Sequence, residues 1–295
     1  MKPRDMALAA LTSAIWGFAF VLYNFGLASF TPSQLVALRF LIACLPILVV
    51  PRPRISWRLI VLIGLTLFTG QFLLLFLAFA LGMPAGLASV TQQMQAFFTV
   101  LLAAAFLGDR PSLRQLIGMT VAFAGLALVA GTTGTDLKLP ALAVALSAAL
   151  SWAVGNVLVK RTTDVPMFPL MVWCSLVPPL PALLFSRLFD HGPSFLQAFG
   201  HASWSSLGVA LYLGTLASPV AYGIWGHLLR RYSTAVVAPF ALLSPCTGVL
   251  GSTLILGETF GAVRLAGMAL ILGGLAVILL PAKHWATAQD FERPT

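Results

Sequence analysis

Long apolar stretches alternate with short polar segments along the whole chain. A membrane-spanning helix needs about 20 mostly apolar residues. The sequence predicts ten such segments, at residues 6–27, 34–51, 59–81, 84–107, 114–131, 140–159, 167–186, 204–226, 233–256 and 262–281. Proline, glycine and charged residues separate them, as in Pro51-Arg52-Pro53-Arg54. The first segment resembles a signal peptide, but its apolar run continues to Leu27, which predicts a retained helix. The pattern predicts an all-α integral membrane protein.

The composition supports a membrane protein and argues against a nucleic-acid-binding protein. The chain is 59% hydrophobic and 8% charged, whereas a soluble protein carries roughly 25% charged residues. Its net charge of +9 would suit a nucleic-acid partner, but the basic residues lie in short loops between apolar runs. We therefore expect a lipid bilayer and a small molecule as partners, and neither nucleic acid nor an obligate protein partner.

The basic residues are divided unequally between the two sides of the predicted membrane. One side holds thirteen of them: Lys2, Arg4, Arg52, Arg54, Arg58, Arg110, Arg114, Lys160, Arg161, Arg230, Arg231, Lys283 and Arg293. The other side holds Lys138, Arg187 and Arg264, while Arg39 lies within a span. Because cytoplasmic loops are enriched in Lys and Arg, both termini are predicted to be cytoplasmic, in the inner or plasma membrane.

An internal repeat divides the chain. LGDRPSLRQLIGMTVAFAG at 107–125 matches LGETFGAVRLAGMALILGG at 256–274, and the region around Trp16 matches that around Trp152. The repeats are predicted at 1–135 and 136–282, followed by a cytoplasmic tail at 283–295. Each holds five spans, an odd number, so the second copy enters the membrane inverted. Inverted repeats are typical of secondary transporters.

The ordered set of these elements resembles a known family. It comprises Trp16-Gly17, Ala37-Leu38-Arg39-Phe40, the two Leu-Gly-Asp/Glu elements, and the segment from Gly214 to Glu258. Together they resemble a ten-helix member of the drug/metabolite transporter superfamily, in the EamA-type branch. The resemblance implies a basket-like bundle in which spans 1, 3, 4, 6, 8 and 9 enclose a central cavity. It also implies peripheral spans 5 and 10, and export of amino acids or other small metabolites.

Three glutamines, Gln92, Gln93 and Gln95, lie inside the fourth apolar segment. On a regular helix, Thr91, Gln92, Gln95 and Thr99 share one face. An amide without a hydrogen-bond partner in hydrocarbon costs about 4–8 kcal/mol, so these side chains must face protein or a wet cavity. Helix–helix contact is the alternative. We expect Gln92 and Gln95 to line a substrate cavity.

Other polar and aromatic side chains within spans are cavity candidates, with ordinary packing as the alternative. They are Trp16, Gln71, Thr91, Thr99, Trp152, Asn156, Tyr212, Ser218, Tyr222, Trp225 and Ser244. Pro219, Pro239 and Pro245 are hinge candidates, because proline bends a helix. Arg39 is expected to have a structural role, since the resemblance places its span outside the cavity. Asp109 and Glu258 are expected to cap helices, and Gly118, Gly125, Gly267 and Gly274 to allow close helix packing.

None of the eight carboxylates lies in the middle of a span, so we expect downhill transport or exchange rather than strong ion coupling. Cys44, Cys174 and Cys246 match no metal or redox motif, and no cofactor or catalytic residue is predicted. The sequence predicts an exporter of small neutral or zwitterionic metabolites, such as amino acids including aromatic ones, working by alternating access. A multidrug or quaternary-ammonium exporter is the alternative, and an intramembrane enzyme a remote one.

Overall fold

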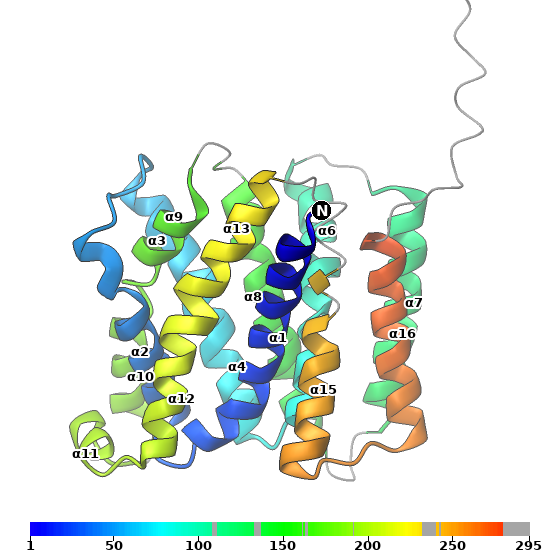
Figure 1. The fold of residues 1–295 in the computed structure, drawn as a ribbon. Helices are drawn as coiled ribbons and strands as arrows, with labels where there is room; N and C mark the ends of the chain where they lie inside the picture. The colour runs from blue at the N-terminus through cyan, green and yellow to red at the C-terminus, as the bar shows by residue number, and fades with distance from the viewer. Residues whose placement is uncertain are drawn as a thin grey trace, which may run out of the picture.

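The computed structural model describes residues 1–107, 111–132, 137–160, 162, 165–190, 192–231, 240–241 and 243–279. Helices make up these ranges almost entirely (Figure 1). The first predicted repeat holds α1 (Pro3–Gly26), α2 (Pro32–Ala43), η1 (Leu45–Leu48), α3 (Trp57–Ile63), η2 (Gly64–Gly70), α4 (Gln71–Ala80), α5 (Ala85–Thr91), α6 (Met94–Leu107) and α7 (Leu113–Ala130). The second holds α8 (Leu139–Lys160), α9 (Met167–Cys174), α10 (Pro179–Phe189), α11 (Phe195–Gly200), α12 (Trp204–Thr215), η3 (Leu216–Val220), α13 (Ala221–Arg231), α15 (Leu243–Leu256) and α16 (Ala262–Leu279).

Six helices are long and apolar enough to cross a membrane. They span Pro3–Gly26, Trp57–Ala80, Ala85–Phe106, Leu139–Val159, Met167–Phe189 and Trp204–Trp225. Four shorter apolar helices cover Pro32–Leu48, Leu113–Val129, Leu243–Leu256 and Ala262–Val277. The prediction of a helical membrane protein is therefore confirmed at this level.

Local sequence signals set several helix starts. Thr31 and Gln34 form a capping box at the start of α2, and Ser112 and Gln115 form one at the start of α7. In each case the hydroxyl accepts a hydrogen bond from a backbone N–H that the helix leaves unpaired, and the amide bonds back to the capping residue. These starts lie within two residues of the predicted ones.

The prediction of continuous spans needs correction. The third and eighth spans contain π-helical turns, η2 and η3, and Pro219 lies inside η3. The fourth is interrupted between α5 and α6, and the seventh between Cys174 and Pro179. The short helix α11 was not predicted. The ninth span was predicted from residue 233, but its described helix, α15, begins at Leu243; residues 232–239 and 242 lie outside the described ranges.

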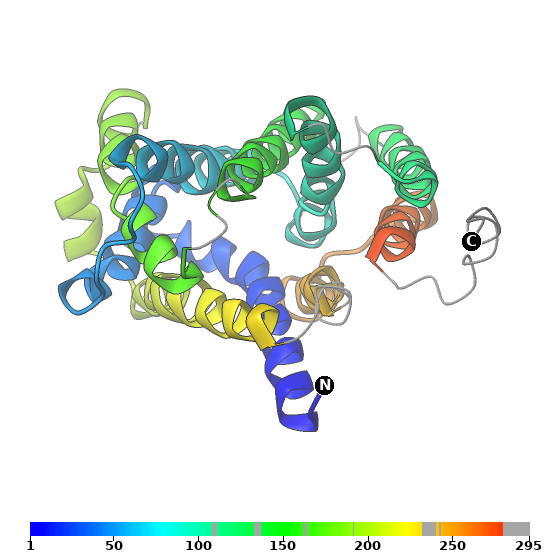
Figure 2. The same ribbon diagram turned by 90° about the horizontal axis from the view of Figure 1, so that it is seen from above.

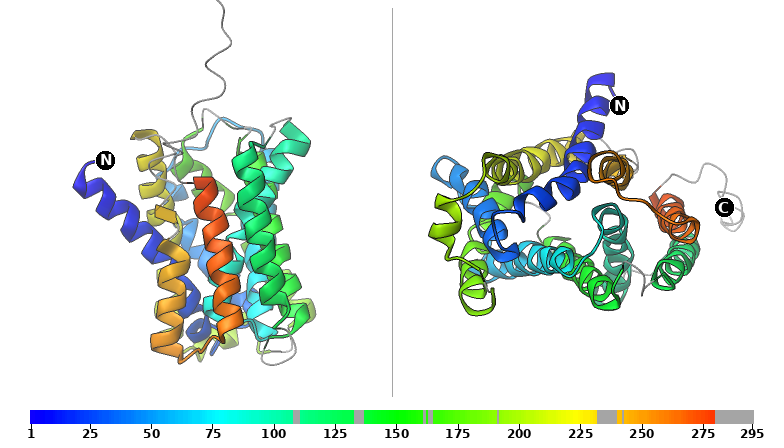
Figure 3. Two further views of the ribbon diagram at one scale, coloured as in Figure 1. Left: turned by 90° about the vertical axis from the view of Figure 1, so that its right-hand side faces the viewer. Right: turned by 90° about the horizontal axis from the view of Figure 1, so that it is seen from below.

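Helices of the two predicted repeats interleave. Helix α1 packs against α15, α2 against α10 and α12, and α4 against α8, as the view from above shows (Figure 2). The helices α7 and α16 form a pair that stands at one edge of the bundle (Figure 3). The sequence repeats are therefore not separate packing units.

Glycine allows the close approach within this edge pair. A Cβ on Gly267 would lie 2.7 Å from the Gly125 carbonyl oxygen, and one on Gly274 would lie 2.4 Å from the Gly118 carbonyl oxygen. Carbon and oxygen cannot approach so closely without displacing the backbone. The close-packing role predicted for these four glycines agrees with this geometry.

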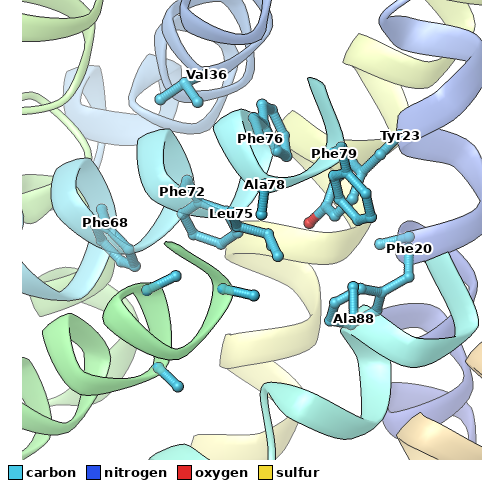
Figure 4. Packing of buried hydrophobic residues seen from close by; sticks show 14 of the residues in the cluster. Phe20, Tyr23, Val36, Phe68, Phe72, Leu75, Phe76, Ala78, Phe79 and Ala88 are labelled. Atoms are coloured by element: carbon cyan, nitrogen blue, oxygen red, sulfur yellow. The ribbon is translucent and has the colours of Figure 1, made fainter. Parts of the chain in front are cut away.

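Aromatic side chains fill the interior beside α4. Phe68, Phe72, Phe76 and Phe79 follow one another along η2 and α4 and approach Tyr23 of α1 (Figure 4). The ring centres of Tyr23 and Phe76 lie 4.5 Å apart, in an edge-to-face arrangement that aromatic pairs favour. This packing fixes α1 against α4 beside the polar groups described next.

Candidate functional site

The three glutamines lie where the fourth span is broken. Instead of the regular four-residue spacing, the N–H of Gln93 bonds to the Val90 carbonyl at 2.9 Å and that of Gln95 to the Gln92 carbonyl at 3.1 Å. The Gln93 side-chain amide donates to the Ser89 carbonyl at 3.3 Å. Irregular backbone at membrane depth is tolerated where protein or a water-filled cavity surrounds it. The break therefore marks a specialised part of the bundle.

A cluster of amide and hydroxyl groups joins α6 to α8. The Asn156 side-chain nitrogen donates to Oε1 of Gln95 at 3.3 Å and to Oγ1 of Thr99 at 3.4 Å. All three side chains are half-buried. The structure thus brings three of the predicted cavity residues together from segments far apart in the sequence. We call Gln95, Thr99 and Asn156 the amide cluster.

Gln92 has different surroundings. It is 1% exposed, and neither the oxygen nor the nitrogen of its amide has a hydrogen-bond partner among the described residues. The hydroxyl groups of Thr91 and Ser13 are also buried without partners. Thr91 and Gln92 lie before the break and are buried, whereas Gln95 and Thr99 lie after it and are half-buried, so the single continuous helix face expected for the four residues is interrupted.

A second group of predicted residues meets at η3. The Trp16 ring lies 5.2 Å from that of Tyr222 and 5.5 Å from that of Trp225, between ring centres. Its Nε1 donates to the Ala217 carbonyl at 3.1 Å. The π-helical turn at η3 thus presents a carbonyl to the first helix, and the three rings form a continuous aromatic surface.

Arg39 of α2 lies beside these rings. Its side chain is 3% exposed, and its Nε donates to Ser218 Oγ at 3.1 Å. Its Nη1 donates to the Tyr23 hydroxyl at 3.0 Å, and the guanidinium carbon lies 3.9 Å from the centre of the Phe72 ring. Arg39 was expected to have a structural role, and these contacts do join α2 to α1, η3 and α4. The sequence placed Arg39 on its helix but could not give the direction of its long side chain.

The remaining candidates are dispersed. The Tyr212 hydroxyl donates to the Ile15 carbonyl at 2.8 Å, and Ser244 packs so closely on α1 that a Cβ at Gly17 would lie 2.1 Å from the Ser244 carbonyl oxygen. Trp152 is half-buried against the hydrophobic core. Gln71 is 2% exposed; its backbone N–H donates to the Phe68 carbonyl, and its side chain forms no hydrogen bond to a described residue. These contacts suit helix packing.

The three prolines predicted as hinges differ in their positions in the structure. Pro219 lies within η3, where the helix is locally irregular. Pro245 is the third residue of α15 as described from Leu243, a position where proline is tolerated, and its role as a hinge stays a prediction. Pro239 lies outside the described residues.

Carboxylates cap helices at one end of the bundle. Glu258 accepts hydrogen bonds from the backbone N–H groups of Ala85 at 2.7 Å and Gly86 at 3.0 Å, which joins the end of α15 to the start of α5. Asp190 accepts from the hydroxyls of Thr31 and Ser33. The predicted capping role of Glu258 is confirmed, whereas Asp109 lies outside the described residues.

One groove between α7 and α8, of about 300 Å³, is lined by apolar side chains alone: Phe123, Leu126, Ala127, Leu139, Leu142, Ala143 and Leu146. A substrate site combines apolar walls with a few polar groups that orient the ligand. This groove has none, and it suits a lipid chain better than a zwitterion.

Known proteins resemble this chain over nearly its whole length. A probable amino-acid metabolite efflux pump of Salmonella typhimurium is 39% identical over 94% of this chain and 95% of its own. A probable terminal-alkyne amino-acid exporter of Streptantibioticus cattleyicolor is 29% identical over 91% of each chain. A solved crystal structure superposes with a TM-score of 0.69 at 20% identity, over 98% of this chain and 100% of its own, and shows the fold alone.

The family comparison covers both predicted repeats. The EamA-like transporter family matches residues 5–131 and again residues 139–280. This double match spans the aromatic surface at η3, the buried arginine and the amide cluster. The chain is therefore a member of the EamA-like transporter family.

Proposed function

We propose that this protein exports amino acids and related small zwitterionic metabolites across the inner membrane by alternating access. The observation that carries the proposal is the position of the interior polar groups. They gather where the third, fourth and eighth spans depart from regular helix. Broken helices at the midplane supply backbone and side-chain groups to the substrates of secondary transporters. The names of the two relatives, an amino-acid metabolite efflux pump and an amino-acid exporter, favour amino acids as the substrates.

The proposed topology has ten spans in two inverted five-helix repeats, with both termini in the cytoplasm. Among the described residues, six helices are long enough to span a membrane, and four shorter apolar helices would account for the other four proposed spans. The excess of Lys and Arg on one side supports the orientation. Because helices of the two repeats interleave, the moving units must each draw helices from both repeats.

The proposed transport is downhill or by exchange. The described carboxylates Asp5, Asp190 and Glu258 contact a basic side chain, hydroxyl groups and backbone N–H groups respectively. Proton- and sodium-coupled carriers commonly depend on acids within the membrane. Strict dependence of transport on an imposed pH gradient in proteoliposomes would contradict this part of the proposal.

Counterflow in proteoliposomes tests the function. Vesicles are loaded with one unlabelled amino acid at a time, and uptake of labelled tryptophan or threonine is followed. We expect the wild type to accumulate label in exchange for its substrates. Loss of accumulation with the whole panel would overturn amino-acid export.

Variants of the amide cluster test the site. Gln95→Ala and Asn156→Ala each break the hydrogen bond between α6 and α8, and we expect each to slow exchange about tenfold or more, since a polar contact to substrate is worth roughly 1–2 kcal/mol. Thr253→Ala, at an exposed position of α15, is the control and should exchange at the wild-type rate. Wild-type exchange by both cluster variants would assign the cluster to helix packing.

A further inference from the structure

Arg39 is a cation in the interior of the bundle. Its side chain starts on α2 and reaches α1 through Tyr23, η3 through Ser218, and α4 through the Phe72 ring. Only 3% of its surface is exposed. A charged side chain within a membrane segment costs at least about 2.5–3.5 kcal/mol, and such residues generally pair with a counter-charge or serve a functional site.

The protein supplies Arg39 with neutral partners only. Within the described ranges, no carboxylate lies within ion-pair distance of its guanidinium. Asp5 lies 3.7 Å from Arg231, and Asp190 and Glu258 bind groups at helix starts. The other five carboxylates, Asp109, Asp136, Asp164, Asp290 and Glu292, fall outside the predicted spans. Among the described carboxylates, none supplies a counter-charge to Arg39.

The guanidinium also retains unused donors. It carries five N–H groups in a planar fork, of which Nε and Nη1 bind Ser218 and Tyr23. Nη2 forms no hydrogen bond to a described residue. The Tyr23 hydroxyl accepts from Nη1, and its own proton has no acceptor among the described residues. Arg39 and Tyr23 together offer at least two donors, the number that a carboxylate accepts in a bidentate contact.

Aromatic rings surround these donors. Phe72 and Phe40 lie 3.9 and 5.4 Å from the guanidinium carbon, measured to the ring centres. Phe40 is 4.9 Å from Phe68, and Phe68 is 6.2 Å from Tyr222, which contacts Trp16. A continuous line of rings thus leads from the arginine to the aromatic surface at η3. Such a surface suits the apolar or aromatic side chain of an amino acid.

We propose that Arg39, assisted by the Tyr23 hydroxyl, binds the carboxylate of the transported amino acid, while the rings at η3 receive its side chain. The inference rests on the proposed function and assigns one end of its substrate. The carboxylate supplies a counter-charge and takes up donors that the contacts with Ser218 and Tyr23 leave unused. Carboxylate and guanidinium geometries match, which explains why arginine rather than lysine occupies the position.

A purely structural role for Arg39 makes a different prediction. A residue that only ties α2 to α1 and η3 affects all substrates equally when it is changed. A residue that binds the carboxylate affects only substrates that carry one. Discrimination between an amino acid and its amide, which keeps the α-amino group but lacks the carboxylate, therefore separates the two roles, whatever the effect of the substitution on stability.

The test measures inhibition of labelled tryptophan counterflow by tryptophan and by tryptophanamide, in wild type, Arg39→Gln and Arg39→Lys. We expect the wild type to prefer tryptophan by about 10- to 100-fold, as for hydrogen bonds to a charged group. Arg39→Gln should lose this preference because tryptophan loses the contact to its carboxylate, whereas the amide has no carboxylate to lose and is no longer repelled by a cation. Arg39→Lys should retain part of it. Arg187→Gln, at an exposed position on α10, is the matched control.

The outcomes are distinct. If the wild type exchanges amino acids but Arg39→Gln keeps the full preference for tryptophan, the inference is wrong and the proposed function stands. If the wild type exchanges no amino acid, the proposed function fails and the inference fails with it. If Arg39→Gln does not fold, Tyr23→Phe removes one donor and keeps the ring. It should reduce the preference severalfold, and an unchanged preference would overturn the inference.

Discussion

Gln92 carries a primary amide whose two ends are both buried and unsatisfied. An amide in this position lowers stability, because a buried donor or acceptor without a partner costs about 1–3 kcal/mol. Side chains that destabilise a fold are retained where function needs them. At the residue scale, the Gln92 amide is therefore expected to lower the stability of the fold while it supports transport.

Replacing Gln92 with an apolar side chain of similar shape should expose this conflict. We expect Gln92→Met to raise the free energy of unfolding by about 1–3 kcal/mol, seen as a higher melting temperature in detergent, and to slow counterflow. Gln93→Met is the control: it removes a hydrogen bond to the Ser89 carbonyl and should not stabilise. A lower melting temperature for Gln92→Met would show that Gln92 is satisfied in the folded protein.

Sequence reasoning recognised most of the interior polar residues by type but not their neighbours. Trp16, Tyr222 and Trp225 do meet, because spacing along one helix is enough to place two of them. Arg39 and Tyr23 were not connected, since their contact depends on helix rotation and on a flexible side chain. Gln92 and Gln95 were placed on one face because apolar periodicity cannot reveal a break within a span.

At the scale of elements, helices contact one another through a capped helix end, at α5, and through glycines, between α7 and α16. The Glu258 carboxylate binds two N–H groups at the start of α5, where a helix leaves donors unpaired and the helix dipole favours negative charge. This bond closes one end of the bundle between α5 and α15. It was foreseeable that Glu258 caps a helix, but not which helix, because the partner lies far away in the sequence.

Glu258→Gln keeps the shape of this cap and removes its charge and one acceptor. We expect a loss of about 1 kcal/mol in the free energy of unfolding, measured by thermal unfolding in detergent. The control is Thr253→Ala on α15, the helix that ends just before Glu258. An unchanged melting temperature would mean that the two backbone N–H groups find other partners without cost.

The contact between α7 and α16 provides a second test at this scale. Gly267→Leu places a side chain against the Gly125 carbonyl, and overpacking of this kind costs about 1–3 kcal/mol. The melting temperature should fall accordingly. Gly273→Leu is a matched control, because a Cβ on Gly273 meets no atom within 4 Å. Equal behaviour of the two variants would argue against tight packing at the edge pair.

At the scale of the whole molecule, charge distribution predicts orientation. Fusion of green fluorescent protein after residue 295 should fluoresce, and alkaline phosphatase fused there should be inactive, because both report a cytoplasmic end. A truncation with alkaline phosphatase after Gly200, in the segment between α10 and α12, should be active. The reverse pattern would invert the proposed topology.

The interleaving of helices has a consequence for how the protein is made. Arg39 and its partner Ser218 are 179 residues apart in the sequence. At about 5–20 residues per second of synthesis, the arginine enters the membrane roughly ten to forty seconds before the serine exists. Gln95 is likewise synthesised before its hydrogen-bond partner Asn156. Until the second repeat has been synthesised, the insertion machinery or lipid headgroups must therefore keep these polar side chains of the first repeat out of contact with hydrocarbon. Biogenesis is thus the stage at which this membrane protein is most vulnerable.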